Sequence, residues 1–201
     1  MSSGNVDNND FPPTEEPVYI LGKKYSALHE LEDLKEDFRS LIWLTYRKGF
    51  PPIGRTGPTT DRGWGCMLRC GQMVVANALL RKQVSREWRW PPPPVCNEEE
   101  PVVSQDRPLP SSYKQILTLF SDHKLAPYSI HQISQMGESE GKPVGTWFGP
   151  NTVAQALKKL SVYEKSNGLN IHVAMDNLVI VNEISKYCVT MTLSLMYCLF
   201  P

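Results

Sequence analysis

The spacing of the apolar residues differs from one part of this chain to another, and the first regular spacing predicts a helix. Between positions 28 and 45, apolar residues recur every three or four positions, with charged residues between them. This pattern is typical of an amphipathic helix that packs one face on a core. We expect it to end near Gly49, because Pro51 and Pro52 cannot continue a helix, so that Tyr46 falls in its last turn. The positions on this face are Leu28, Leu31, Leu34, Phe38, Leu41, Ile42 and Thr45.

A second apolar stretch runs almost unbroken from Met73 to Leu80. It is too long for an ordinary strand and predicts a buried helix, which we place from Cys66 to about residue 82. The loop before it contains Gly63 and Gly65, so Cys66 lies where a glycine-rich loop enters a helix. The unpaired N–H groups and the dipole of a helix start favour a thiolate at that position.

Shorter patterns predict the remaining elements. Apolar residues before Gly22 predict a short strand that ends in a turn, and short helices are expected over 113–119 and 129–136. Asn151 is expected to cap a further helix. Apolar and polar residues alternate from 169 to 176, which predicts a half-buried strand.

Three segments fall outside these elements. Residues 1–16 are rich in Ser, Asn, Asp and Pro, as in a flexible tail. Residues 91–111 begin with four consecutive prolines and have little apolar content, which predicts a mobile surface loop. Residues 189–201 are apolar and uncharged but too short to span a bilayer. We therefore expect one core over residues 17–188.

Composition narrows the classes of function. Lys plus Arg number 21 and Asp plus Glu number 21, so the charge balance does not point to nucleic acid or an anionic membrane as a partner. Five cysteines are scattered and no apolar signal segment opens the chain, which predicts free thiols and a cytoplasmic location. The spacing of Cys66 and Cys70 has no second pair and does not fit a zinc site. We expect Cys70 to be packed, although a redox role beside Cys66 stays open.

The residues alone leave two interpretations of Cys66. A free cysteine is often a small buried hydrophobe. A cysteine at a glycine-flanked helix start is also well placed to be a nucleophile, because glycines let a substrate backbone approach closely.

Longer motifs add a family resemblance. The segment GWGCMLRCGQM at 63–73 resembles the nucleophile segment of the autophagins, cysteine proteases that process and recycle the ubiquitin-like modifiers of autophagy. The resemblance implies a papain-like α+β fold, of which the chain holds the helical portion and the start of the sheet. It also implies a monomer that needs no cofactor and acts on a ubiquitin-like modifier, either free or joined to lipid. Further matching segments, in the same order, are PVYILGKKY at 17–25, WLTYRKGFPPIG at 43–54, YSIHQ at 128–132, WFGPNTVAQ at 147–155 and VAMDN at 173–177.

The same resemblance implies roles for single residues. Cys66 would be the nucleophile, and Tyr46 with a backbone N–H near Cys66 would hold the oxyanion. Trp147 would clasp the narrow glycine-ended tail of the substrate, and Trp64 and Gly65 would contact it beside the nucleophile. The plainer interpretations are core filling for Tyr46 and a packing lid for Trp147.

The autophagins take their catalytic histidine from an Asp-Pro-His segment, and this chain has none. We therefore expect a truncated or alternatively spliced form with weak or absent peptidase activity. The alternative is a modifier-binding decoy or a form without function. Asp122 with His123, and His172 with Asp176, could suggest acid–base pairs. We expect the first pair in an exposed turn and the second on the surface, roughly 13 Å apart along one strand; His131 is expected to be structural.

Overall fold

The computed structural model describes residues 11, 14–90, 109–174, 178, 180–182, 185 and 195–197. These residues belong to two compact units. The smaller unit contains the described residues up to Leu41 together with 87–90, and the larger contains 42–86 and those after 108.

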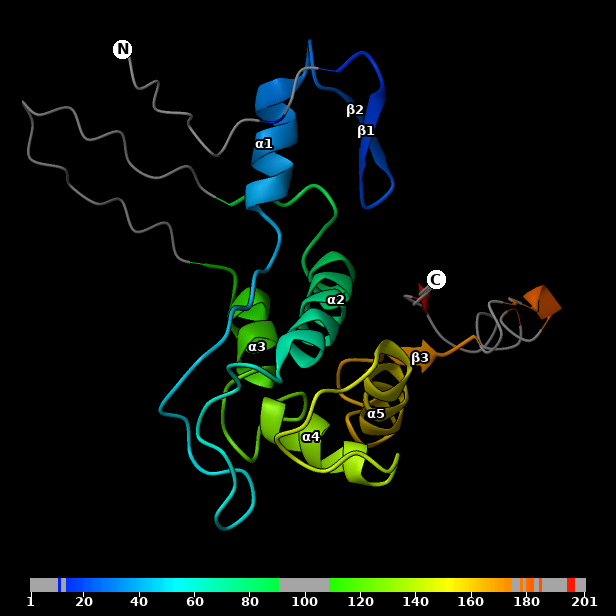
Figure 1. Ribbon diagram of the computed structural model, residues 1–201. Coiled ribbons are helices and arrows are strands. Elements are labelled where there is room, and N and C mark those ends of the chain that lie inside the picture. The colour runs from blue at the N-terminus through cyan, green and yellow to red at the C-terminus, as the bar shows by residue number, and fades with distance from the viewer. Residues whose placement is uncertain are drawn as a thin grey trace, which may run out of the picture. The chain divides into compact units, whose positions relative to one another are not determined.

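The smaller unit is built on a hairpin and one helix (Figure 1). Strands β1 (Pro17–Ile20) and β2 (Lys23–Ser26) pair antiparallel. The turn between them has positive φ at Leu21 (47°) and at Gly22 (88°). This is the geometry of a type I′ turn, whose twist matches that of paired strands. The strand before Gly22 and its turn are confirmed, whereas β2, which opens with two lysines, was not predicted.

Helix α1 (Leu31–Arg39) is shorter than predicted. The prediction that it continues to near Gly49 is wrong. At its end the hydroxyl of Ser40 donates to a carbonyl four residues back (2.6 Å), a bond that weakens a helix slightly. Residues 42–47 are not helical. Tyr46 therefore does not lie in the last turn of a helix.

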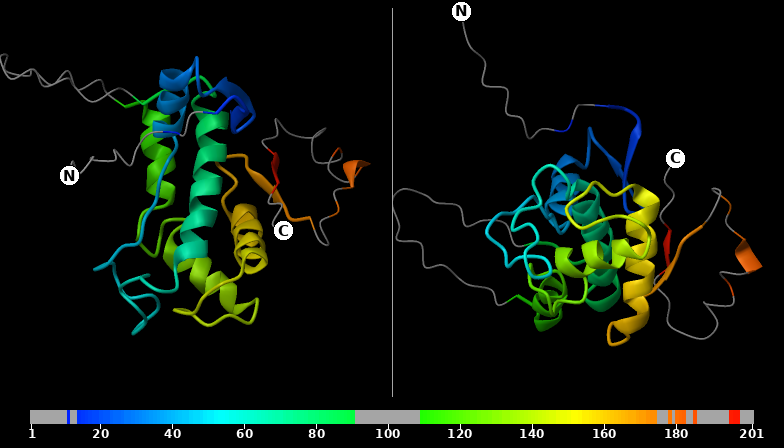
Figure 2. Two further views of the ribbon diagram at one scale, coloured as in Figure 1. Left: turned by 45° about the horizontal axis from the view of Figure 1, so that its top comes forward. Right: turned by 60° about the horizontal axis from the view of Figure 1, so that its bottom comes forward.

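The larger unit is a cluster of helices around α2 (Cys66–Gln83). Helices α3 (Ser111–Leu119), α4 (Ile130–Glu138) and α5 (Pro150–Tyr163) each pack against α2 (Figures 1 and 2). The helices predicted over these residues are confirmed. Most residues of α2 are buried or half-buried. The first residue of this helix is therefore held by a helix that is packed against its neighbours.

The predicted cap of α5 is wrong. Gly149, with extended backbone, is the N-cap, and Pro150 occupies the first helical position. Proline is favoured there because its ring presets φ and its missing N–H would have no helical partner. Asn151 lies one residue further on and is exposed. The apolar residues of this helix that are buried are Val153, Ala154, Ala156, Leu157 and Leu160.

Strand β3 (Asn170–His172) follows α5. Its buried neighbours confirm the alternation predicted from the sequence, since Leu169, Ile171 and Val173 are all buried. Strand β4 (Leu195–Tyr197) pairs with β3 in parallel register.

Several predicted features lie wholly or largely outside the described residues. They are the tail over 1–16, the proline-rich loop over 91–111, the surface position of Asp176 and the segment 189–201. In the described part of the chain, no helix is both long enough and apolar enough to cross a membrane.

Candidate active site

Cys66 is the first residue of α2, with Gly65 as N-cap. Its thiol is free and partly exposed. The predicted junction of a glycine-rich loop and a helix is therefore confirmed. The N–H groups of Trp64 and Gly65 both donate to the carbonyl of Asp61 (3.2 and 2.8 Å). A backbone donor for an oxyanion must then come from Cys66 or the residues after it, where helix N–H groups have no helical acceptor.

Tyr46 reaches this site from the extended segment 42–47. The side chain of Asn77 on α2 holds the segment, since its Oδ1 accepts from the Ile42 N–H (2.9 Å) and its Nδ2 donates to the Ile42 carbonyl (3.1 Å). Ile42 and Leu44 are buried, and the residues between and after them are exposed. Tyr46 itself is 50% exposed, so it is not filling the core.

The Tyr46 hydroxyl lies beside the Cys66 sulfur. Loss of solvent around the phenol raises the pKa of Tyr46, and the charge of Cys66 and a hydrogen bond to its side chain raise that pKa further. The negative charge of Asp61 acts in the same direction. A phenol with a raised pKa stays protonated at neutral pH and remains a hydrogen-bond donor. The structure thus brings together the two residues that the sequence assigned to chemistry, although the roles themselves stay predictions.

The two residues before Cys66 are buried. Trp64 is 7% exposed, and its ring N–H donates to the carbonyl of Thr60 (2.9 Å). At Gly65 a side chain would collide with Asp61, because a Cβ there would lie 2.5 Å from the Asp61 Cβ. Position 65 therefore requires glycine because of its contact with Asp61, which could not be predicted from the sequence. Substrate contact by Trp64 and Gly65 stays a prediction.

Trp147 projects from the loop between α4 and α5 and is 53% exposed, whereas its neighbour Phe148 is fully buried. The loop lies against the one that leads to Cys66, since a Cβ at Gly145 would be 3.4 Å from the Pro58 ring. An exposed indole on a loop anchored by Phe148 is free to meet a ligand. The role of Trp147 as substrate clasp stays a prediction.

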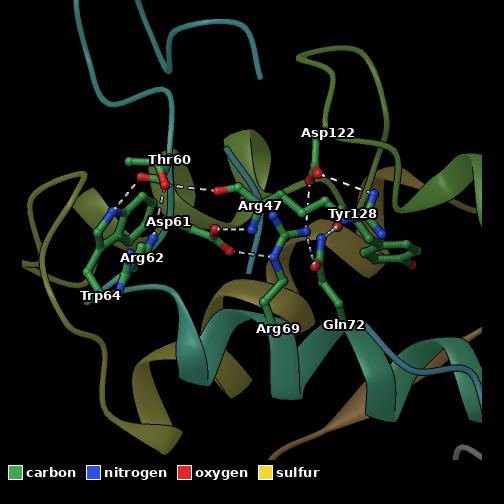
Figure 3. Close-up of polar contacts among 9 residues, drawn as sticks. All are labelled: Arg47, Thr60, Asp61, Arg62, Trp64, Arg69, Gln72, Asp122 and Tyr128. Atoms are coloured by element: carbon green, nitrogen blue, oxygen red, sulfur yellow. Dashed lines mark hydrogen bonds and ion pairs between the residues drawn. The ribbon is translucent and has the colours of Figure 1, made fainter. Parts of the chain in front are cut away.

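A buried polar network underlies the site, and none of its contacts was predicted from the sequence (Figure 3). Asp61 and Arg69 are 0% and 2% exposed, and Arg69 Nε donates to Asp61 Oδ2 (2.6 Å). Arg69 Nη1 donates to Asp122 Oδ1 (2.8 Å) and to Gln72 Oε1 (3.1 Å). The backbone N–H of Arg47 donates to Asp61 Oδ1 (2.6 Å). Charged groups of this kind are stably buried only when their charges are paired. Arg69 Nη2 and Asp122 Oδ2 are buried without a hydrogen-bond partner among the described residues.

This network corrects one expectation about the acid–base candidates. His123 is exposed as expected, but Asp122 is not an exposed turn residue, because its carboxylate pairs with Arg69 and with Arg47 (3.4 Å). His131 is structural, as predicted: it is buried, and its Nε2 bonds to the Pro51 carbonyl (2.7 Å).

The prediction that Cys70 is packed is wrong, because Cys70 is exposed. It lies one turn after Cys66 on α2, and Val74, one further turn along, is also exposed. This side of α2 is therefore open in the described part of the chain. Within the same residues, no three His, Cys, Asp or Glu side chains are grouped as metal ligands would be.

Known proteins match this chain over most of its length. The model of the peptidase C54 catalytic domain matches residues 31–196. The cysteine protease ATG4B of Xenopus laevis is 52% identical over 183 residues, which are 91% of this chain and 44% of that protein. The cysteine protease ATG4A of Homo sapiens is 45% identical over 185 residues, which are 92% of this chain and 43% of that protein. The chain spans less than half the length of these relatives. Since the family model covers most of its residues, this protein belongs to the peptidase C54 family, the autophagins that its motifs predicted.

Proposed function

We propose that this chain is the nucleophile-bearing part of an autophagy cysteine protease with a papain-like fold. In this proposal it receives the glycine-ended tail of a ubiquitin-like modifier at Cys66. The observation that supports it most is the free, partly exposed thiol of Cys66 at the start of α2, with which the side chain of Tyr46 interacts. Acyl transfer needs a thiol at a site that favours its thiolate and a hydrogen-bond donor for the oxyanion.

In the proposed reaction, the Cys66 sulfur attacks the carbonyl carbon of the C-terminal glycine. Tyr46 and an N–H at the start of α2 donate to the oxygen as it becomes negatively charged. The Cys66 thiol loses its proton to solvent as the S–C bond forms. When the tetrahedral intermediate collapses, the C–N bond breaks, the amine takes a proton from solvent, and a thioester remains for water to hydrolyse. The amine can belong to the next residue of a precursor or to a lipid head group, so the same steps serve both substrates.

Trp147 supplies the proposed substrate specificity. Its exposed indole stands on the loop that contacts the approach to Cys66. In this proposal the flat indole ring leaves room for a glycine-ended tail and excludes bulky side chains. Cleavage would therefore follow a glycine.

Proton transfer limits turnover in this proposal. No Asp-Pro-His segment occurs in these 201 residues, and the described contacts of His123 and His131 are with backbone groups and with Phe50 rather than with Cys66. Without a general base, protease rates fall by orders of magnitude. We therefore propose that this chain alone cleaves at a rate close to background.

A cleavage assay tests the proposal. The purified chain is incubated with a modifier extended past its terminal glycine, and the products are identified by mass spectrometry. Cys66→Ala is compared with Cys70→Ala, which removes an exposed thiol one turn away on the same helix. We expect slow cleavage after the glycine that Cys66→Ala abolishes and Cys70→Ala retains.

Two other results would change the assignment. Cleavage at the rate of a full-length relative would mean that a surrogate base exists. No cleavage by folded protein that still binds the modifier would support a decoy, and absence of both cleavage and binding would contradict the proposed function.

A further inference from the structure

We propose that Asp61 is a positioning residue that fixes Tyr46 against Cys66. The inference rests on the roles given to Tyr46 and Cys66 under the proposed function, and it assigns Asp61 no contact with substrate. The carboxylate of Asp61 is fully buried in the network of Figure 3. It is therefore not available as a catalytic base.

The first half of the argument concerns the Tyr46 side of the site. Asp61 Oδ1 accepts from the N–H of Arg47 (2.6 Å), the residue directly after Tyr46. The Arg47 carbonyl in turn accepts from the Asp61 N–H (3.3 Å) and from the Thr60 hydroxyl (2.9 Å). Both backbone groups of Arg47 are thus held by residues 60 and 61. Because Arg47 directly follows Tyr46, these bonds also hold the backbone from which the Tyr46 side chain extends.

The second half concerns the Cys66 side. The Asp61 carbonyl accepts from the N–H of Gly65 (2.8 Å), the N-cap of α2. The Asp61 side chain also packs on Gly65, where no Cβ could be accommodated. Its Oδ2 accepts from Arg69 Nε (2.6 Å), one turn into α2. Asp61 therefore holds the helix start on both sides of Cys66.

One carboxylate thus connects two segments that are about twenty positions apart in the sequence. A charge-assisted bond to a buried guanidinium is among the strongest protein hydrogen bonds, and burial keeps water from competing for it. Small displacements at an active site have large effects on rate. Loss of Asp61 should therefore separate Tyr46 from Cys66 even where the fold survives.

Asp122 provides a matched control. It also pairs with Arg69 and with the side chain of Arg47, but no described hydrogen bond joins it to the backbone of Arg47 or to Gly65. Asp122→Asn removes a charge from the same network as Asp61→Asn does. Only Asp61→Asn replaces one of the two acceptor oxygens that together hold the Tyr46 segment and the helix start.

The test is a double-mutant cycle on the reactivity of Cys66, which needs no protease turnover. Folded protein is treated with iodoacetamide at neutral pH, so that the thiolate forms an S–C bond and displaces iodide. Peptide mass spectrometry then gives the rate at Cys66 and, as an internal reference on the same helix, at exposed Cys70. Tyr46→Phe removes the hydroxyl that is hydrogen-bonded to the Cys66 side chain, and it is expected to slow the reaction at Cys66 about threefold or more.

We expect Tyr46→Phe to have this effect in the wild-type and Asp122→Asn backgrounds, and to have almost none in the Asp61→Asn background. The rate at Cys70 should stay constant throughout. Gly65→Ala displaces the Asp61 side chain without removing a charge, and it should abolish the Tyr46 effect as well. This variant keeps the test valid if Asp61→Asn does not fold.

An undiminished Tyr46 effect in Asp61→Asn, or in Gly65→Ala should the former not fold, would overturn the proposal. Equal loss of the effect in Asp122→Asn, or a rise at Cys66 and Cys70 together, would also overturn it, because either would indicate general loosening of α2. A missing Tyr46 effect in the wild type would contradict the contact on which the proposal stands. Absence of both modifier cleavage and modifier binding, with the cycle as expected, would refute the proposed function and leave the role of Asp61 in place.

Discussion

At the scale of single residues, Arg69 joins three buried or partly buried side chains of the larger unit. Its guanidinium is almost fully buried and is shared by Asp61, Asp122 and Gln72. Removing one member of a buried ion pair leaves an uncompensated charge, which usually costs more than the pair itself contributes. The network therefore stabilises the folded protein, and it also holds the segments that carry Cys66 and Tyr46.

Arg69→Met should destabilise the protein by about 3–5 kcal/mol, because it leaves the Asp61 carboxylate buried without its partner. The matched control is Lys114→Met, which removes an exposed positive charge from α3 and should change the free energy of unfolding by less than about 0.5 kcal/mol. Urea unfolding followed by circular dichroism measures both values. Equal values for the two variants would refute the structural role of Arg69.

At the scale of elements, the close approach of α2 and α5 depends on a glycine. A Cβ at Gly71 would lie 2.5 Å from Val153 Cγ1 and 2.9 Å from Leu157 Cδ1. Both of these residues are buried on α5. The contact fixes the spacing of two of the helices that support the site.

Gly71→Ala should destabilise the protein by about 1–3 kcal/mol through overpacking. This holds although alanine favours a helix over glycine by about 1 kcal/mol. Val153→Ala in the same protein removes the atom that the new methyl group meets, so the double variant should recover part of the loss. Thermal unfolding of the two single variants and the double variant gives the coupling. A stabilising Gly71→Ala would show that α2 and α5 are further apart than the structure places them.

Local patterns predicted the elements in which apolar residues recur at a regular helix or strand spacing. The helices α2, α3, α4 and α5 and the alternation around β3 all follow from apolar spacing and were predicted. Residues 42–47 were missed, because their apolar spacing continues that of α1. What makes them extended is Asn77, 35 positions away, which satisfies both backbone groups of Ile42.

The same limit applies to the site. The motifs predicted Cys66 and Tyr46, and the structure brings the two together. Asp61, Arg69 and Asp122 were not predicted, because a charged residue in a sequence is ordinarily read as exposed. Only the distances among them show that their charges compensate one another.

At the scale of the whole molecule, buried tyrosine side chains make the stability of the protein depend on pH. Burial raises the pKa of Tyr113 above its ordinary value of 10.0. Burial also raises the pKa of Tyr128, with a smaller opposing effect from a hydrogen bond to Asn167. In both cases the folded state holds the phenolic proton more tightly than the unfolded state does.

Stability should therefore be unaffected by these groups below about pH 10 and should fall above it, since the unfolded tyrosines ionise first. Tyr128→Phe removes one such proton and should flatten the decline by at most about 1.4 kcal/mol per pH unit. Tyr163→Phe, at a position that is 79% exposed, is the matched control and should leave the decline unchanged. Urea midpoints between pH 8 and 11 test this. The same decline in Tyr128→Phe as in the wild type would contradict it.

The central claim, that Cys66 is the nucleophile for a glycine-ended modifier, is tested most directly by covalent capture. A ubiquitin-like modifier whose terminal glycine carries a thiol-reactive group is mixed with the folded chain, and the adduct is mapped by mass spectrometry. Capture needs no general base for turnover, so it tests recognition and nucleophile alone. We predict an adduct at Cys66 that Cys66→Ala abolishes and Cys70→Ala retains. No adduct, or one formed at the more exposed Cys70, would contradict the claim.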